Sequence, residues 1–443
     1  MYKTKLFLGT FLIYFFSWAL VYSLGINKLA IQSEDTLPAM FLPVSIIKDH
    51  TFYVDNYYQM LLHKYPNPDD TDFTRGFVPF YVKQVGIHYI SSFPLVAGLL
   101  SVPVYFLPVT LGVPITWENL TVLAHLSAAL IAATSGVALY VLLKKHLLQD
   151  DKKALGLTLI YLFATINFAL VSQSLWQHGV LELFTILGIY FMYEKKYFMF
   201  GLSMGLAILS RPTAIVPATI LGILLFIKSF KDKKLLLNYC LKAGIGVLLC
   251  ALFFFWYNNK YYVSVENQGY ASQIVSEWKS NFPEGFLGVW LSPSKGILVY
   301  SPVFIFSLAG LWLARKKPNY LIFGLIVLLH TLVIGKWKHW YGGWSFGYRM
   351  SSDIIPFLIL LLVPYLKSSF FEKTKKLFYA LVFLSVGIEV FGLLFFDGIW
   401  HAAYDNGFEH TSWLWSIKDS EFVFNMRRVL VKVGLLAKAC PKC

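Results

Sequence analysis

Long runs of apolar residues separated by short polar connections dominate this chain of 443 residues. A helix needs roughly 20 predominantly apolar residues to cross a bilayer. The first run follows Lys3 and Lys5 and continues to about Gly25 without a small-residue cleavage site, so we expect a signal anchor. Further candidate spans lie at about 94–113, 118–143, 154–172, 178–193, 197–210, 212–227, 239–258, 297–313, 319–335, 352–366 and 377–396. The pattern predicts an all-α polytopic membrane protein with about 11–13 transmembrane helices.

Composition and charge agree with this prediction. Hydrophobic residues make up 57% of the chain and charged residues only 14%, against about 25% in soluble domains. These values exclude a soluble enzyme, a disordered tail and a secreted disulfide scaffold. The net charge of +14 would suggest nucleic acid in a soluble protein. Here the basic residues cluster between alternate spans, at 144–153, 195–196, 228–234, 315–317 and 367–376. Such loops are cytoplasmic under the positive-inside rule, so we expect no nucleic-acid partner.

The connections on the other side are then extracytoplasmic. The longest are 26–93, 259–296, 336–351 and the tail from 397. A single crossing at 94–113 would place the basic loop 144–153 on the same side as 26–93, against the charge rule. Because the later loops obey the rule, we expect 94–113, which Pro103 and Pro108 interrupt, not to cross as one simple helix.

The first outer loop, 26–93, is predicted to be structured. Its short apolar stretches at helical spacing favour helices in the membrane interface. The segment F-V-P-F-Y-V-K-Q-V-G-I-H-Y-I-S-S alternates around Gly86, which predicts a small hairpin. We expect one transmembrane module over 1–397, followed by a short aromatic and basic tail, 398–443, on the membrane surface.

Two adjacent carboxylates, Glu34 and Asp35, follow the first span closely. Carboxylates near lipid cost free energy unless they are paired, solvated or used. One interpretation is a general base that takes a proton from an acceptor hydroxyl, with the neighbour holding a metal or the geometry. The alternative is a helix cap, in which Asp35 or Ser33 binds amides of a helix that begins near Leu37.

Two basic residues lie in breaks between apolar segments. Arg211 in L-S-R-P-T-A has little polar sequence around it, and its guanidinium suits a phosphate bidentately. The alternative is snorkelling to the lipid headgroups. Lys295 lies in G-V-W-L-S-P-S-K-G-I-L-V-Y-S-P, where turn residues at membrane depth predict a cavity wall and a lysine that meets an anionic group.

His178 and Glu182 lie one helical turn apart in W-Q-H-G-V-L-E-L, at the start of a span. They would share a helix face. The spacing suits two metal ligands, but no third candidate ligand is near them in the sequence. We therefore favour a hydrogen-bonded pair that lines a cavity over a metal site.

The segment G-K-W-K-H-W-Y-G-G-W-S-F-G-Y-R-M-S-S-D, 335–353, combines aromatic, basic and glycine residues. One interpretation is an aromatic belt with turns. The other is a binding surface, because aromatic rings stack on sugars and basic residues hold a phosphate. Its candidate substrate-cavity residues are His339, Trp340, Tyr341 and Trp344, and its candidate phosphate-binding residue is Arg349.

One span, an early acidic pair, interfacial helices and roughly ten further spans together resemble the GT-C superfamily of integral membrane glycosyltransferases. That superfamily includes protein O-mannosyltransferases and bacterial enzymes that glycosylate lipid A. The resemblance covers the architecture from Lys3 to about Asp397. It is sharpest at Ser33–Thr36, Tyr89–Pro94, Ser210–Thr213, Ser292–Pro302 and Trp340–Asp353.

The resemblance implies an inverting transferase in the plasma (inner) membrane. It would move a sugar from a polyprenyl-phosphate donor to a hydroxyl of a glycan, lipid or protein on the extracytoplasmic side. Asp35 would be the base, with Glu34 beside it. The lipid phosphate would be neutralised by Arg211, Lys295 or Arg349. Further carboxylate candidates in the first outer loop are Asp55, Asp69, Asp70 and Asp72.

Two questions stay open at this level. No cofactor is implied with certainty, and a divalent metal is possible, although paired carboxylates alone do not hold such an ion firmly. The alternative function is a transporter or flippase for a lipid-linked saccharide. It would use the same aromatic cavity, and it would not need the chemistry of Asp35.

Overall fold

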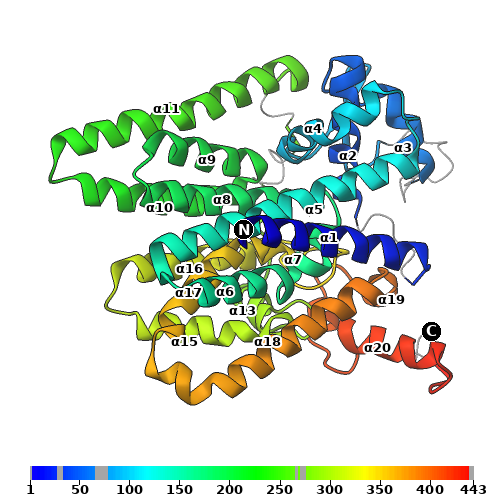
Figure 1. Ribbon diagram of the computed structural model, residues 1–443. Coiled ribbons are helices and arrows are strands. Elements are labelled where there is room, and N and C mark those ends of the chain that lie inside the picture. The colour runs from blue at the N-terminus through cyan, green and yellow to red at the C-terminus, as the bar shows by residue number, and fades with distance from the viewer. Residues whose placement is uncertain (1, 27–32, 65–77, 265–267, 270–275, 439–443) are drawn as a thin grey trace.

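The computed structural model describes residues 2–26, 33–64, 78–264, 268–269 and 276–438 (Figure 1). Its α-helices are α1 (Tyr2–Ser23), α2 (Leu37–Val44), α3 (Tyr58–Lys64), α4 (Val96–Thr110), α5 (Trp117–Leu142), α6 (Asp151–Phe163), α7 (Ile166–Ala169), α8 (Gln177–Tyr193), α9 (Tyr197–Ser210), α10 (Ile215–Ser229), α11 (Lys233–Tyr257), α13 (Glu284–Leu291), α14 (Ile297–Tyr300), α15 (Ile305–Leu313), α16 (Pro318–Lys336), α17 (Ile355–Leu366), α18 (Ser369–Phe395), α19 (Ile399–Tyr404) and α20 (Glu421–Lys432). The short helical turns are η1 (Glu34–Thr36), η2 (Ser45–Asp49), η3 (Asp55–Tyr57), η4 (Leu143–Leu148), η5 (Val171–Gln173), η6 (Pro212–Ala214), η7 (Asn258–Tyr262), η9 (Pro302–Phe304), η10 (Arg349–Ile354) and η11 (Thr411–Leu414).

The predicted all-α polytopic class is confirmed. Seven helical stretches of the described residues are long and apolar enough to cross a membrane: Tyr2–Ser23, Trp117–Leu148, Pro212–Ser229, Lys233–Tyr262, Pro318–Lys336, Arg349–Leu366 and Ser369–Phe395. An eighth results if Asp151–Phe163 and Ile166–Gln173, bent by 49°, form one broken span. Shorter apolar helices are Val96–Thr110, Tyr197–Ser210 and Pro302–Leu313. The predicted spans are therefore helical, but several stop short of the bilayer thickness where proline or serine interrupts them.

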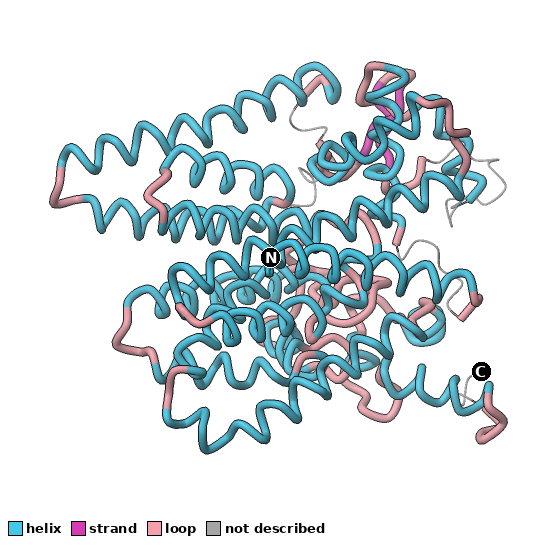
Figure 2. The backbone as a smooth tube through the Cα atoms, viewed as in Figure 1, coloured by secondary structure: helices cyan, strands magenta, loops and turns pink. Residues whose placement is uncertain are grey.

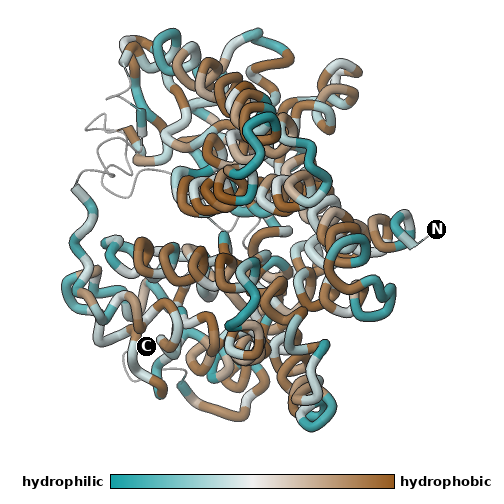
Figure 3. The backbone as a smooth tube through the Cα atoms, turned by 90° about the vertical axis from the view of Figure 1, so that its left-hand side faces the viewer, coloured by the Kyte–Doolittle hydropathy of each residue, from teal (hydrophilic) through white to brown (hydrophobic). Residues whose placement is uncertain are grey.

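The basic loops gather at one end of the molecule. In Figure 1 the α10–α11, α15–α16 and α17–α18 connections lie at the left, and the elements of the first outer loop lie at the right with α19 and α20. Figure 3 looks onto the left-hand end, where hydrophilic turns join hydrophobic helices. We call these the basic end and the outer-loop end. The grouping agrees with the expectation that the basic connections share one side of the membrane.

The first outer loop contains the predicted hairpin. Strands β1 (Val82–Val85) and β2 (His88–Ser91) pair antiparallel, with Val85 opposite His88 (Figure 2). The turn between them contains Gly86 at a φ of +62°, a conformation that glycine adopts without strain. Every residue of α2 is buried, so this apolar helix is part of the core and not a helix exposed at the interface.

Helix α4 agrees with the interpretation of 94–113. Its 15 residues extend about 22 Å at 1.5 Å per residue, less than a hydrocarbon core of about 30 Å. It contains Pro103 and Pro108, and Leu111 and Gly112 end it. The segment is thus a short helix beside α2 and not a simple long crossing (Figure 1).

Helix α17 is the most deeply buried long element. All of its residues from Ile355 to Leu366 are buried, as expected for a helix that is apolar on every face. It continues directly from η10, which carries Arg349 and Asp353. These two polar side chains are therefore attached to the rigid centre of the molecule.

Candidate functional site

The segment 337–354 brings three groups of charged residues together at the outer-loop end. The first is the ion pair of Asp35 and Arg349. The Arg349 Nη1 donates to Asp35 Oδ2 at 2.8 Å. The guanidinium also lies over the ring of Trp176, 4.8 Å from its centroid, in cation–π geometry. The Asp35 and Arg349 side chains are 21% and 12% exposed, so neither is fully buried.

The helix-cap alternative applies to Ser33 and not to Asp35. The Asp35 backbone N–H donates to Ser33 Oγ at 3.4 Å, and the Thr36 hydroxyl donates to the Ser33 carbonyl at 2.9 Å. No side chain caps the start of α2. The Ser174 hydroxyl bonds Thr36 at 2.9 Å and fixes η1 to the segment before α8. The Asp35 carboxylate therefore caps no helix, and its partner is the Arg349 guanidinium.

Glu34 has a different environment from its neighbour. Burial raises the pKa of the Glu34 carboxyl, and the Asp35 charge raises it further. Burial disfavours the charged form of a carboxyl, so Glu34 keeps its proton to a higher pH than an exposed glutamate does. The Arg349 charge acts on both carboxyls, but its ion pair is with Asp35.

The second group surrounds Asp353. Arg211 Nη1 donates to both Asp353 oxygens at 2.9 Å, and the Thr213 hydroxyl donates at 2.7 Å. His178 Nδ1 lies 2.9 Å from Asp353 Oδ1, and His330 Nε2 lies 3.2 Å from Asp353 Oδ2. The carboxylate and the charged groups around it are buried. We call these five residues the Asp353 cluster.

This geometry corrects two expectations. Arg211 was expected at a donor phosphate, but its charge is taken up by Asp353 inside the protein. His178 and Glu182 were expected to pair with each other, but His178 contacts Asp353 whereas Glu182 accepts from the Asn167 side-chain amide at 3.0 Å. The reason is the same in both cases: the buried Asp353 carboxylate needs a cation and several donors, and Arg211 and His178 supply them.

The third group surrounds Lys295. Its ammonium lies 3.4 Å from Glu421 Oε2 and 3.0 Å from His401 Nε2, and it donates to the Ser345 carbonyl. The Tyr300 hydroxyl donates to the same Glu421 oxygen at 2.9 Å. Lys295 was expected to meet a donor phosphate. It is instead fully buried, and its charge ties α20 and α19 to the transmembrane module. We call Lys295, Glu421, His401 and Tyr300 the tail clamp.

The four aromatic candidates of the segment 335–353 separate into buried and exposed pairs. Trp340 is buried on Gly288, where a Cβ atom would be 2.2 Å from its ring. Tyr341 is buried, and its hydroxyl bonds His339 at 3.1 Å. His339 is exposed, and Trp344 is 52% exposed. Only His339 and Trp344 of these four therefore offer a ligand an open ring face.

The other carboxylates of the first outer loop were further candidates for the base. Asp55 accepts from the Tyr89 backbone N–H at 2.6 Å and lies 2.6 Å from His88 Nδ1, so it holds the hairpin in place. The remaining candidates, Asp69, Asp70 and Asp72, lie outside the described residues.

The possible divalent metal finds no ligand set in the described part of the chain. No three His, Cys, Asp or Glu side chains there are placed to hold a metal ion together. Glu34 and Asp35 alone supply two carboxylates, whereas Mg²⁺ and Ca²⁺ take six or more oxygen ligands. We therefore derive no step through a metal.

Comparison with known proteins gives no relative. No protein-family model matches the chain, and neither a curated protein nor a solved structure is significantly similar to it. The function must therefore be argued from the charged groups and their geometry alone.

Proposed function

We propose that the protein is a membrane glycosyltransferase. It moves a sugar from a polyprenyl-phosphate donor to a hydroxyl of a glycan, lipid or protein acceptor, on the extracytoplasmic side of the plasma membrane. The observation that carries the proposal is the ion pair of Asp35 and Arg349. A polytopic membrane protein here holds a carboxylate and a guanidinium 2.8 Å apart, and both side chains are partly exposed.

The two groups supply the base and the cation that a glycosyl transfer needs, and the substrates must enter between them and open the 2.8 Å ion pair. The Asp35 carboxylate takes the proton of the acceptor hydroxyl, and the acceptor oxygen bonds the anomeric carbon from the face opposite the phosphate. The bond between the anomeric carbon and the phosphate oxygen breaks, and its electron pair leaves with the lipid phosphate. Arg349 stabilises the negative charge on that phosphate, for which its planar fork is well shaped. The configuration at the anomeric carbon inverts.

The surrounding residues support this assignment by fixing Arg349. The Asp353 cluster anchors η10 four residues beyond Arg349, and Trp176 limits the guanidinium from one face. The groups of a catalytic site act best when their positions are set before the substrate binds. His339 and Trp344 offer ring faces for the sugar in the same segment.

The test uses the purified protein in proteoliposomes with a panel of polyprenyl-phosphate sugars. The measurement is the release of free polyprenyl phosphate. We expect the wild type to consume one donor and Asp35→Asn to consume none while still inserting and unfolding cooperatively. Glu118→Gln is the matched control, because Glu118 is an exposed carboxylate whose nearest cation is Lys64 of the first outer loop, at 3.9 Å.

The same experiment separates the transfer from transport. A flippase would move the intact lipid-linked saccharide between leaflets without releasing free phosphate, and Asp35→Asn would move it at the wild-type rate. That outcome, or full transferase activity in Asp35→Asn, would refute the proposed role of Asp35.

A further inference from the structure

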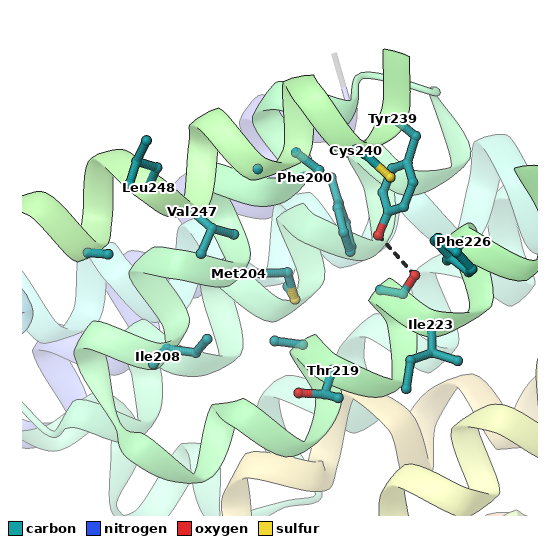
Figure 4. Close-up of a pocket in the computed structure, with 15 residues that line it drawn as sticks. Phe200, Met204, Ile208, Thr219, Ile223, Phe226, Tyr239, Cys240, Val247 and Leu248 are labelled. Atoms are coloured by element: carbon teal, nitrogen blue, oxygen red, sulfur yellow. Dashed lines mark hydrogen bonds between the residues drawn. The ribbon is translucent and has the colours of Figure 1, made fainter. Parts of the chain in front are cut away.

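An apolar groove opens on the surface formed by α9, α10 and α11, away from the proposed active site. Its volume is about 670 Å³. Figure 4 shows Phe200 and Met204 of α9 between the side chains of α10 and those of α11. Ile223 on α10 and Leu248 on α11 are each 53% exposed, so the groove opens laterally, toward lipid in a membrane.

The groove follows from the spacing of small residues on two helices. On α10 the lining includes Ala218 and Gly222, and on α11 it includes Ala243, Gly244 and Ala251. Residues four apart share a helix face. Small side chains on such a face project little from the helix, so they leave open space along one side of α10 and one side of α11. A Cβ atom at Gly244 would meet nothing within 4 Å, which shows that the space above this residue is open.

One end of the groove lies beside a cluster of exposed lysines. Phe226 lies near the end of α10 and Tyr239 less than two turns from the start of α11, and the loop that joins the two helices lies at the basic end. The loop and the first turn of α11 contain Lys231, Lys233 and Lys234, all exposed and none in an ion pair within the described residues. The carboxylate beside them, Asp232, accepts from the Leu235 backbone N–H and caps α11. The groove therefore joins an apolar channel to uncompensated positive charge.

We propose that this groove binds an anionic glycerophospholipid of the bilayer leaflet at the basic end. One acyl chain lies between α10 and α11 on the floor formed by α9, and the phosphate contacts Lys231, Lys233 and Lys234. Basic pockets between membrane helices recognise anionic headgroups in this way. The proposal does not depend on the glycosyltransferase function.

The charges favour a phosphate at the lysine-rich end of the groove over a phosphate at its opposite end. There the groove reaches Ile208 and Thr219, and the nearest cation in the chain, Arg211, is already paired with Asp353. Among the described residues at that end, a carrier-lipid phosphate would meet only Lys260, which lies nine residues beyond Ala251 with its ammonium over the rings of Trp256 and Tyr261. A second copy of the chain would place apolar helices in the groove without using the lysines.

The test uses two photoactivatable lipids that carry the same diazirine acyl chain, one with a phosphatidylglycerol and one with a phosphatidylcholine headgroup. Each is added to the full-length protein in phosphatidylcholine nanodiscs, and labelled peptides are identified by mass spectrometry. We expect the phosphatidylglycerol probe to label α9, α10 and α11 more strongly than the phosphatidylcholine probe does. Replacing Lys231, Lys233 or Lys234 singly by Gln should reduce labelling by the phosphatidylglycerol probe about fivefold. In the triple variant the two probes should label these helices equally.

Matched variants separate the groove from the general surface. Gly244→Leu fills the groove and should reduce labelling there by both lipids. Gly387→Leu is its control, because a Cβ atom at Gly387 on α18 also meets nothing within 4 Å. Lys316→Gln and Lys317→Gln, in another basic loop, should leave the labelling unchanged. Equal labelling by both headgroups, no effect of Gly244→Leu, displacement by an equal amount of a polyprenyl phosphate, or a dimer that forms through α10 and α11 would each overturn the proposal.

Discussion

Asp35 and Arg349 are 314 positions apart in the chain, yet their side chains form an ion pair of 2.8 Å. Arg349 is held from two sides, because its guanidinium packs on Trp176 and its helical turn is anchored through Asp353. Asp35 is held from one side only, through the helical turn that Ser33 caps. The proposed base and the proposed phosphate-binding group are therefore positioned by separate parts of the fold.

Replacing Arg349 tests its proposed role in binding the lipid phosphate. In Arg349→Ala we expect kcat/KM for the lipid donor to fall by about 10²-fold or more, as when one preorganised donor to a developing charge is removed. Arg349→Lys should recover only part of the loss, because an ammonium lacks the planar fork and the stacking on Trp176. The measurement is the steady-state release of polyprenyl phosphate.

The control for Arg349 is Lys338→Ala in the same segment. Lys338 pairs with Glu277 at 3.3 Å and has no assigned role in the reaction. We expect it to keep nearly full activity. If Arg349→Ala were as active as Lys338→Ala, Arg349 would not bind the phosphate.

The Asp353 cluster is predicted to be structural. Asp353→Asn leaves the Arg211 guanidinium buried without a counterion, and breaking a buried pair on one side costs about 3–5 kcal/mol. We expect a large fall in the thermal unfolding temperature of the purified protein. The double variant Asp353→Asn with Arg211→Gln should lose less than the sum of the two single losses, because the lone charge is gone. An Asp353→Asn protein as stable as the wild type would contradict this role.

The local features of the fold could be predicted from the sequence. The apolar runs predicted the helices, the two prolines in 94–113 predicted the short α4, and the alternation around Gly86 predicted the hairpin. Each of these signals is contained in a few consecutive residues. Helix lengths were harder, because the end of a helix at a Ser-Pro or Arg-Pro pair depends on what packs around it.

The partners of the charged residues could not be predicted in the same way. Arg211 and Asp353 are 142 positions apart, and Lys295 and Glu421 are 126 positions apart. The sequence shows that a charge at membrane depth needs a partner, but not which one the fold supplies. Glu421 lies in the tail, which the apolar pattern placed outside the transmembrane module, so its contact with Lys295 had no signal in the sequence.

Lys295→Gln distinguishes a tail clamp from a phosphate site. In the clamp, Glu421 loses its cation while fully buried, so we expect a lower unfolding temperature and faster trypsin cleavage within 405–438 at fixed pH. The KM for the lipid donor should stay within about twofold of the wild type. A phosphate site would show the opposite, with a raised KM and unchanged cleavage of the tail.

The tail clamp should also weaken in mild acid. Burial, and then the Lys295 charge, hold the pKa of His401 well below its ordinary value of 6.5. In the detached tail His401 takes up a proton as the pH falls below 6.5, and in the clamp it does not. The detached state therefore binds more protons in this window, and the stability of the clamp falls by about 1.4 kcal/mol between pH 7.5 and pH 5.5. Above about pH 7.5 this contribution is nearly constant. Burial raises the pKa of Glu421 above its ordinary 4.5, which gives a dependence of opposite sign: this contribution is fully present below pH 4.5 and is lost as the pH rises through the raised value.

The measurement is hydrogen exchange of the α19 and α20 amides at pH 7.5 and pH 5.5, corrected for the intrinsic exchange rate at each pH. We expect the opening equilibrium at pH 5.5 to be about tenfold larger, which corresponds to that free-energy change. His401→Gln should remove the difference, because its side chain does not titrate. His410→Gln is the matched control, since His410 is an exposed histidine of the same tail, and it should retain the difference. If His401→Gln and His410→Gln showed the same response to pH as the wild type, the dependence would belong to another group and not to the clamp.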